Sequence, residues 1–199
     1  MQNMKLLLGY RGDPCKSLPE LNPAGVFLAL DRKDAMLYGY VRHASVQVWN
    51  GILRFSTHDM PAYQEQWIQY CERNSSVNPK AFAAAFIVKE GAVFRDSEFL
   101  KDAVVMAFFK ATYQNEYDGV YFHELPTLVD GQPHHEEIFI FDPASVTLSS
   151  DIVDLEYNDA KMKVMRLKKQ EAISLLETKK RKQRRPSSPT EEAKKKLFF

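Results

Sequence analysis

Three short segments, far apart in the chain, carry the side chains that could do chemistry. The first is Tyr10-Arg11-Gly12, where an arginine ends an apolar run and a glycine follows it. A guanidinium group is planar and makes paired, charge-assisted hydrogen bonds to phosphate oxygens. Glycine lets the backbone approach a ligand closely, because it has no side chain. Arg11 is therefore a candidate anion ligand, and a surface arginine that leads into a turn is the alternative interpretation.

The other two segments combine predicted strands with polar residues at their ends. The segment from Gly25 to Tyr38 reads GVFLALDRKDAMLY. Its apolar start predicts a strand, and Asp31 predicts the N-cap of a helix that follows. The third segment consists of YDGV at 117–120 and, after a polar loop, EIFIFDP at 137–143. It predicts a hairpin-like pair of strands, the second of which begins at a glutamate.

Taken together, the three segments resemble the ADP-ribosyltransferase family, particularly its small bacterial and phage forms. The resemblance extends over residues 6–148, apart from 56–112. It implies an α+β fold in which two small antiparallel sheets surround an NAD cleft, with flanking helices. It also implies a domain at 1–157 that uses NAD as its substrate.

The resemblance assigns roles to individual residues. Arg11 would hold the phosphate and ribose of NAD, and Glu137 would be the catalytic glutamate. Breaking the nicotinamide–ribose bond develops positive charge on the sugar, which a fixed carboxylate stabilises more than it stabilises the ground state. Tyr38 either lines the nicotinamide pocket or is a core aromatic residue. The complete set of cofactor-binding residues implied in this way is Tyr10, Arg11, Gly12, Phe27, Leu28 and Tyr38.

The sequence departs from the family pattern at two places. Ala29 and Leu30 stand where many members carry Ser or Thr, so a hydroxyl that would orient the catalytic carboxylate is missing. His135 stands where enzymes that modify side chains often carry Glu or Gln, so the acceptor could be protein or nucleic acid. We expect mono-ADP-ribosyl transfer to a macromolecule. The alternatives are a non-catalytic module that keeps the fold and binds a partner, and NAD hydrolysis without an acceptor.

Other types of catalytic and metal site find little support. Consecutive residues of the HHEE run at 134–137 point to opposite faces of an extended segment, so we predict no metal site there. The sequence contains no P-loop, GxGxxG, GxSxG or HExxH string, so nothing indicates the corresponding nucleotide-binding, hydrolase or zinc-protease chemistry. Cys71 falls on a predicted helix stripe and is expected to be a buried apolar residue.

The remaining elements must position these segments. Helical spacing predicts helices at 61–72, 98–113 and 159–177, and 81–88 fits either helix or strand. We predict strands at 5–10, 46–55 and, at a sheet edge, 146–148.

The composition predicts one globular domain in a reducing compartment. The 199 residues are 45% apolar and include two cysteines without metal-site spacing, which argues against a disulfide scaffold. No apolar window reaches the 18 residues of a membrane span. We therefore expect no membrane span and a cytoplasmic protein, in host cytoplasm if the chain is a phage or bacterial effector.

The charge is divided unevenly between the two ends of the chain. Residues 158–199 contain 14 basic and 5 acidic residues, a net +9, which leaves 13 against 21, or −8, for 1–157. Six of the seven residues at 179–185 are basic. We predict a helix that passes into a disordered tail over 178–190. This tail is either a solvated extension or an electrostatic contact with nucleic acid, a membrane surface or an acidic protein.

Overall fold

The computed structural model describes residues 4–56, 60–75, 77, 80, 86–89, 92–96, 103–123, 127–129, 132–133 and 136–184. The chain divides into two units, Met1–Asn158 and Asp159–Phe199. Its strands are β1 (Lys5–Asp13), β2 (Val26–Ala29), β3 (Tyr40–Val48), β4 (Ile52–Phe55), β5 (Phe86–Lys89), β6 (Ala92–Asp96), β7 (Gly119–Phe122), β8 (Thr127–Val129), β9 (Gln132–Pro133), β10 (Glu137–Ile140) and β11 (Val146–Ile152). Its helices are α1 (Arg32–Ala35), α2 (Met60–Arg73), α4 (Ala103–Tyr113), the 3-10 turn η3 (Pro143–Ser145) and α5 (Leu155–Arg184).

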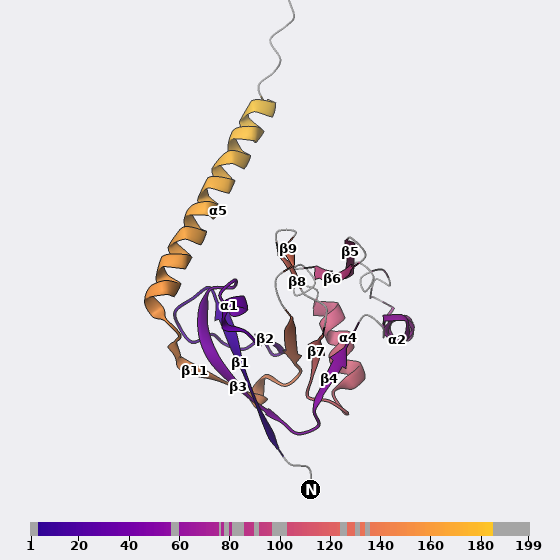
Figure 1. The fold of residues 1–199 in the computed structure, drawn as a ribbon. Coiled ribbons are helices and arrows are strands. Elements are labelled where there is room, and N and C mark those ends of the chain that lie inside the picture. The colour runs from indigo at the N-terminus through magenta and orange to yellow at the C-terminus, as the bar shows by residue number, and fades with distance from the viewer. Residues whose placement is uncertain are drawn as a thin grey trace, which may run out of the picture. The chain divides into compact units, whose positions relative to one another are not determined.

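The first unit belongs to the α+β class, as predicted. Its main sheet has the strand order β11-β3-β1-β2-β10-β7-β4, and a smaller sheet has the order β5-β6-β8-β9 (Figure 1). The expectation that the sheets are purely antiparallel is wrong, because β4 runs parallel to β7 and β6 runs parallel to β8. Parallel neighbours need long connections, and α2 and α4 both lie between β4 and β7 in the sequence.

The segment predicted as one strand over Val46 to Phe55 belongs to two strands, β3 and β4, which lie toward opposite edges of the main sheet. Gly51 has φ of 94°, a left-handed conformation that favours glycine and interrupts the strand. Asp118 stabilises this turn, because its Oδ2 accepts hydrogen bonds from the amides of Trp49 and Asn50 at 2.6 Å each. The chain therefore leaves β3 beside β1 and continues in β4 at the opposite edge of the sheet.

Most other elements agree with the sequence patterns. The Asp31 Oδ1 atom accepts a hydrogen bond from the Lys33 amide at 2.7 Å, so Asp31 is the predicted N-cap of α1. The predicted helices at 61–72 and 98–113 correspond to α2 and α4, with residues 98–102 outside the described part. The ambiguous segment at 81–88 contains strand β5 from Phe86, and its first five residues also lie outside the described part. β11 is an edge strand, as predicted.

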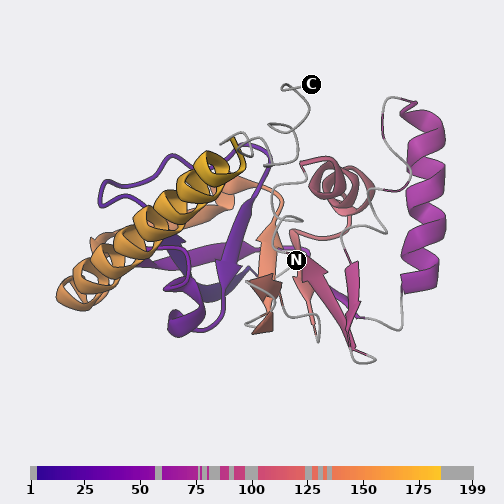
Figure 2. The ribbon, with the colours of Figure 1, turned by 90° about the horizontal axis from the view of Figure 1, so that it is seen from above.

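Two clusters of buried apolar residues lie on opposite faces of the main sheet. On one face, aromatic residues of β4, β7 and β10 pack against α2 and α4, with Trp67 against Phe108 at a ring-centroid distance of 5.3 Å. Both ribbon views show these helices beside the β4 and β7 end of the sheet (Figures 1 and 2). The other cluster consists of aliphatic residues from β2, β3, β10 and β11. Successive side chains of a strand alternate between these faces.

Arg42 of β3 is a fully buried cation, only 1% exposed. Its guanidinium donates hydrogen bonds to the backbone carbonyls of Lys16, Ser149 and Ser150. Lys16 lies between β1 and β2, whereas the two serines belong to β11. Arg42 thus ties the segment after β1 to the edge strand.

The α5 helix continues further than the sequence pattern predicted. It extends through Arg184, so the expected disorder is wrong for 178–184, and residues 185–190 lie outside the described part. Lys, Arg, Gln and Glu are good helix formers, and residues 155–185 contain no Gly or Pro. High charge alone therefore did not mark the end of the helix.

Candidate functional site

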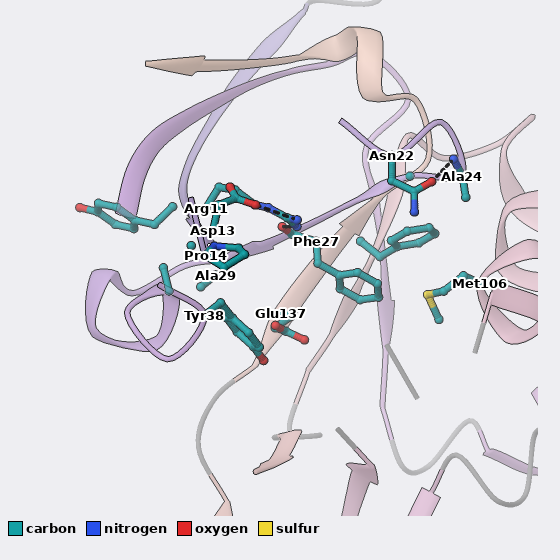
Figure 3. A pocket seen from close by; sticks show the side chains of 15 residues that line it. Arg11, Asp13, Pro14, Asn22, Ala24, Phe27, Ala29, Tyr38, Met106 and Glu137 are labelled. Atoms are coloured by element: carbon teal, nitrogen blue, oxygen red, sulfur yellow. Dashed lines mark hydrogen bonds and ion pairs between the residues drawn. The ribbon is translucent and has the colours of Figure 1, made fainter. Parts of the chain in front are cut away.

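A cavity of about 490 Å³ opens on the aromatic face of the main sheet, within the usual size range of ligand pockets. Strands β1, β2 and β10, helix α4, and the segments that follow β1 and α1 supply its walls (Figure 3). The residues that line it are Tyr10, Arg11, Gly12, Asp13, Pro14, Asn22, Ala24, Gly25, Phe27, Ala29, Ala35, Tyr38, Met106, Glu137 and Phe139. The predicted site residues are therefore brought together, with the exception of Leu28.

Leu28 lies on the opposite face of the sheet. Its side chain is 2% exposed and belongs to the aliphatic cluster with Val26. The two-residue period of a strand explains the difference, because Phe27 and Ala29 face the cavity and the residue between them cannot. The prediction that the Leu28 side chain binds the cofactor is therefore wrong.

Strands β1 and β2 are paired at Tyr10 and Ala29. Arg11 follows this pair in β1, and its side chain extends to the backbone of β2. Its Nη1 donates to the carbonyl oxygen of Phe27 at 3.0 Å, and its Nη2 donates to Asp13 Oδ1 at 3.4 Å. A guanidinium group has five N–H donors. Each Nη atom therefore keeps a second N–H beyond these two bonds. Arg11 is about one-third exposed, which leaves it accessible from the cavity.

Asp13 is an acidic residue of the cavity wall that the sequence motif did not single out. It is 5% exposed, and its Oδ2 is buried without a hydrogen-bond partner among the described residues. Burial raises the pKa of its carboxyl above the ordinary value of 3.8, and the positive charges of Arg11 and Arg42 oppose this effect. Asp13 thus places a poorly solvated carboxylate beside the guanidinium of Arg11.

Glu137 begins β10 and is buried, at 2% exposed. It is paired in register with Ala29 of β2, and Ala29 is paired with Tyr10 of β1. Residues directly opposite each other in a sheet share a face and bring their Cβ atoms to about 5 Å. Ala29, one of the two positions where the resemblance implies a Ser or Thr, therefore holds a methyl group next to Glu137.

Tyr38, Tyr10 and Gly12 are further predicted residues that line the cavity. Tyr38 follows α1 and points into the lower part of the cavity, as does Glu137 (Figure 3). The Tyr10 ring lies 5.2 Å from the ring of His43 and is half-buried. Gly12 has a packing reason to be glycine, because a Cβ there would lie 1.9 Å from the carbonyl oxygen of Ala35. Its close approach to a ligand stays a prediction.

The opposite end of the cavity is apolar, and Phe27 is the residue of this end that the resemblance implied. Phe27 packs against Phe139, with ring centroids 4.7 Å apart, and Met106 of α4 is buried beside this pair. Asn22 and Ala24, from the turn before β2, lie at the same end (Figure 3). Strand alternation from Glu137 could have found Phe139, but no local pattern connects Asn22 or Met106 with this sheet.

Comparison with protein-family models, with curated proteins and with solved structures found no match. No helix in the described part of the chain combines the length and the apolar character needed to cross a membrane. The His134 and His135 positions lie outside the described residues, so the predictions made for them stay predictions.

Proposed function

We propose that this chain transfers ADP-ribose from NAD to a macromolecular acceptor in the cytoplasm, through a domain comprising residues 1–157 with the ADP-ribosyltransferase fold. The observation that supports this most directly is that Arg11 and Glu137, far apart in the sequence, line one ligand-sized cavity. The cavity also combines charged groups with aromatic walls, as recognition of a dinucleotide requires.

The proposed reaction breaks the bond between C1′ of the ribose and the nicotinamide nitrogen. The bonding electron pair leaves with nicotinamide, an electron pair of the acceptor forms the new bond to C1′, and the acceptor releases a proton. Positive charge develops on the sugar during this exchange. The buried Glu137 carboxylate would stabilise that charge, because fixed charges act strongly where water is excluded.

Arg11 would bind the phosphates of NAD in this scheme. Its N–H groups beyond those bonded to Phe27 and Asp13 are suited to phosphate oxygens. Tyr38, Tyr10 and Phe27 would enclose the sugar and base and exclude water.

The experiment is incubation of the full chain with labelled NAD and a bacterial lysate. Glu137→Gln keeps the shape of the side chain and removes its charge, so label transfer is expected to fall by about 10² to 10³-fold. The matched control is Glu136→Gln, because Glu136 is bonded to Tyr121 rather than lining the cavity. Transfer by the Glu137→Gln protein at the wild-type rate would exclude Glu137 as the catalytic group.

The labelled species in this experiment would identify the acceptor as protein or nucleic acid. Release of free ADP-ribose and nicotinamide without a labelled macromolecule would instead indicate NAD hydrolysis.

A second candidate function is a non-catalytic module that keeps the fold and engages a protein or nucleic acid through the basic residues at 179–185. The observation that favours it is Ala29, which offers Glu137 no hydroxyl from the directly opposite position. It predicts a folded protein that consumes no NAD and binds its partner less tightly as salt increases.

A further inference from the structure

The apolar end of the cavity has the features of a binding site for a flat ring. Phe27 is half-buried, whereas Phe139 and Met106 are only 2% and 3% exposed. Phe27 therefore offers the accessible aromatic surface, and it packs against the cluster that contains the two buried side chains. Aromatic rings stack favourably on such a surface in offset arrangements.

Asn22 supplies a hydrogen-bond donor at this end. Its Oδ1 accepts from the Ala24 amide at 2.9 Å, and its backbone carbonyl accepts from the Gly25 amide at 3.0 Å. Because Oδ1 is engaged, Nδ2 is the group left for a ligand, and it has no partner among the described residues. Figure 3 shows this nitrogen directed away from the bond to Ala24, toward the side where Phe27 and Met106 lie.

The turn that carries Asn22 is held in place by α4. Lys110 of this helix donates from Nζ to the carbonyl oxygen of Pro23 at 3.2 Å. Met106, one helical turn earlier, lines the cavity below the turn. Helix α4 therefore contacts the turn that carries the Asn22 donor and also supplies Met106 to the apolar end of the cavity.

The spacing along the sheet connects this end with Glu137. Phe139 lies two residues after Glu137, and it is paired in register with Phe27. Two residues of a strand span about 7 Å. A base attached to a ribose that lies next to Glu137 can therefore reach Phe139 and Phe27.

We propose that the apolar end of the cavity binds a planar nitrogen heteroaromatic base, packed on Phe27, with an acceptor on the edge of the base bonded to Nδ2 of Asn22. The inference rests on the proposed function, because NAD carries two such bases, nicotinamide and adenine. Asn22 is then a specificity-determining residue that distinguishes acceptor-bearing rings from plain apolar ones.

The test measures binding of nicotinamide and, separately, of adenosine to the full chain by calorimetry and ligand-observed NMR. Both probes are neutral, so a change of charge on the protein has little direct effect on them. Asn22→Asp keeps an oxygen for the Ala24 amide but replaces the Nδ2 donor with an acceptor. We expect it to weaken binding of the occupying base about tenfold. Phe27→Leu, which keeps an apolar side chain without the ring, is expected to weaken binding of the same base.

The control is Asn74→Asp, which makes the same charge change at an exposed position of the α2 C-terminal segment that does not line the cavity. It should leave base binding unchanged. The base that loses affinity in Asn22→Asp identifies the occupant. Binding unaffected by both cavity variants would overturn the proposal, and so would failure of the folded wild type to bind either base at millimolar ligand.

The NAD assay separates this inference from the proposed function. NAD consumption together with base binding that is insensitive to the Asn22→Asp substitution would exclude the proposed base site and support the proposed transferase. Base binding that depends on Asn22, without NAD consumption, would keep the base site and remove the transferase.

Discussion

Ala29 is the residue directly opposite Glu137 on the neighbouring strand. It is 4% exposed and lines the cavity. Its methyl group cannot donate a hydrogen bond, so nothing at this position fixes the orientation of the carboxylate.

Ala29→Ser is expected to increase NAD cleavage several-fold, because its hydroxyl can reach a carboxylate on the neighbouring strand. Nicotinamide release is the measurement, with Ala144→Ser, at an exposed position of η3, as the control for adding a hydroxyl. If the wild type is inactive and Ala29→Ser is active, the chain is a binding module that lacks only this group. No effect of Ala29→Ser on an active wild type would show that Glu137 is already oriented.

Asp13 gives the folded protein a predictable pH dependence. Its pKa is raised mainly by burial, so between 3.8 and the raised value the folded state binds more protons than the unfolded state. Stability therefore falls as the pH rises through this interval. Asp13→Asn removes the titration. Urea denaturation at several pH values should show the wild type gaining stability relative to Asp13→Asn as the pH falls through the interval. A difference that does not change with pH would contradict this account.

At the residue scale, the sequence could predict the side chains that carry charge but not all of their surroundings. Arg11 and Glu137 were singled out by the resemblance to family motifs, and both line the cavity. Leu28 was predicted wrongly, although strand alternation would have placed it on the other face. Asn22 and Met106 come from segments that only the tertiary structure brings to this sheet.

At the element scale, the packing of β1 against α1 depends on Gly12. A Cβ there would lie 1.9 Å from a backbone oxygen of Ala35, which belongs to α1 and cannot rotate away. The end of β1 and the helix would have to separate, which would disturb the cavity wall that both supply.

Gly12→Ala is therefore expected to reduce the free energy of unfolding by about 3 kcal/mol or more. Gly51→Asn is the matched control, because Gly51 has a positive φ but open space around it, and Asn tolerates left-handed backbone. It should cost less than about 1 kcal/mol. Chemical denaturation of both variants measures the difference, and equal costs would show that α1 moves aside freely.

The elements themselves were largely predictable, and their pairing was not. Capping by Asp31 and the helical spacing of α2 and α4 are local signals, which sequence patterns report well. The division of 46–55 into β3 and β4 depended on Gly51 and on Asp118, a distant residue that bonds to the turn. The parallel pairing of β4 with β7 likewise depended on contacts distant in sequence.

For the whole molecule, the segregation of charge predicts a salt-sensitive interaction at the C-terminal side. The acidic residues predominate in 1–157 and the basic residues in 158–199. If the six basic residues at 179–185 contact phosphates, replacing all six with Gln should reduce the slope of log affinity against log salt by about five for double-stranded DNA. Fluorescence anisotropy with DNA of random sequence measures this slope. An unchanged slope would place the partner of this segment outside nucleic acids.

The buried Arg42 couples the edge strand β11 to the segment that follows β1, which is distant from it in sequence. Its guanidinium bonds to Lys16, in the segment that supplies part of the cavity wall, and to Ser149 and Ser150 in the edge strand β11. Neither part can open alone without leaving a buried charge short of acceptors. The two should therefore exchange their amide hydrogens with deuterium as one cooperative unit. A ligand that closes the cavity would then slow exchange in β11, a strand that it never touches.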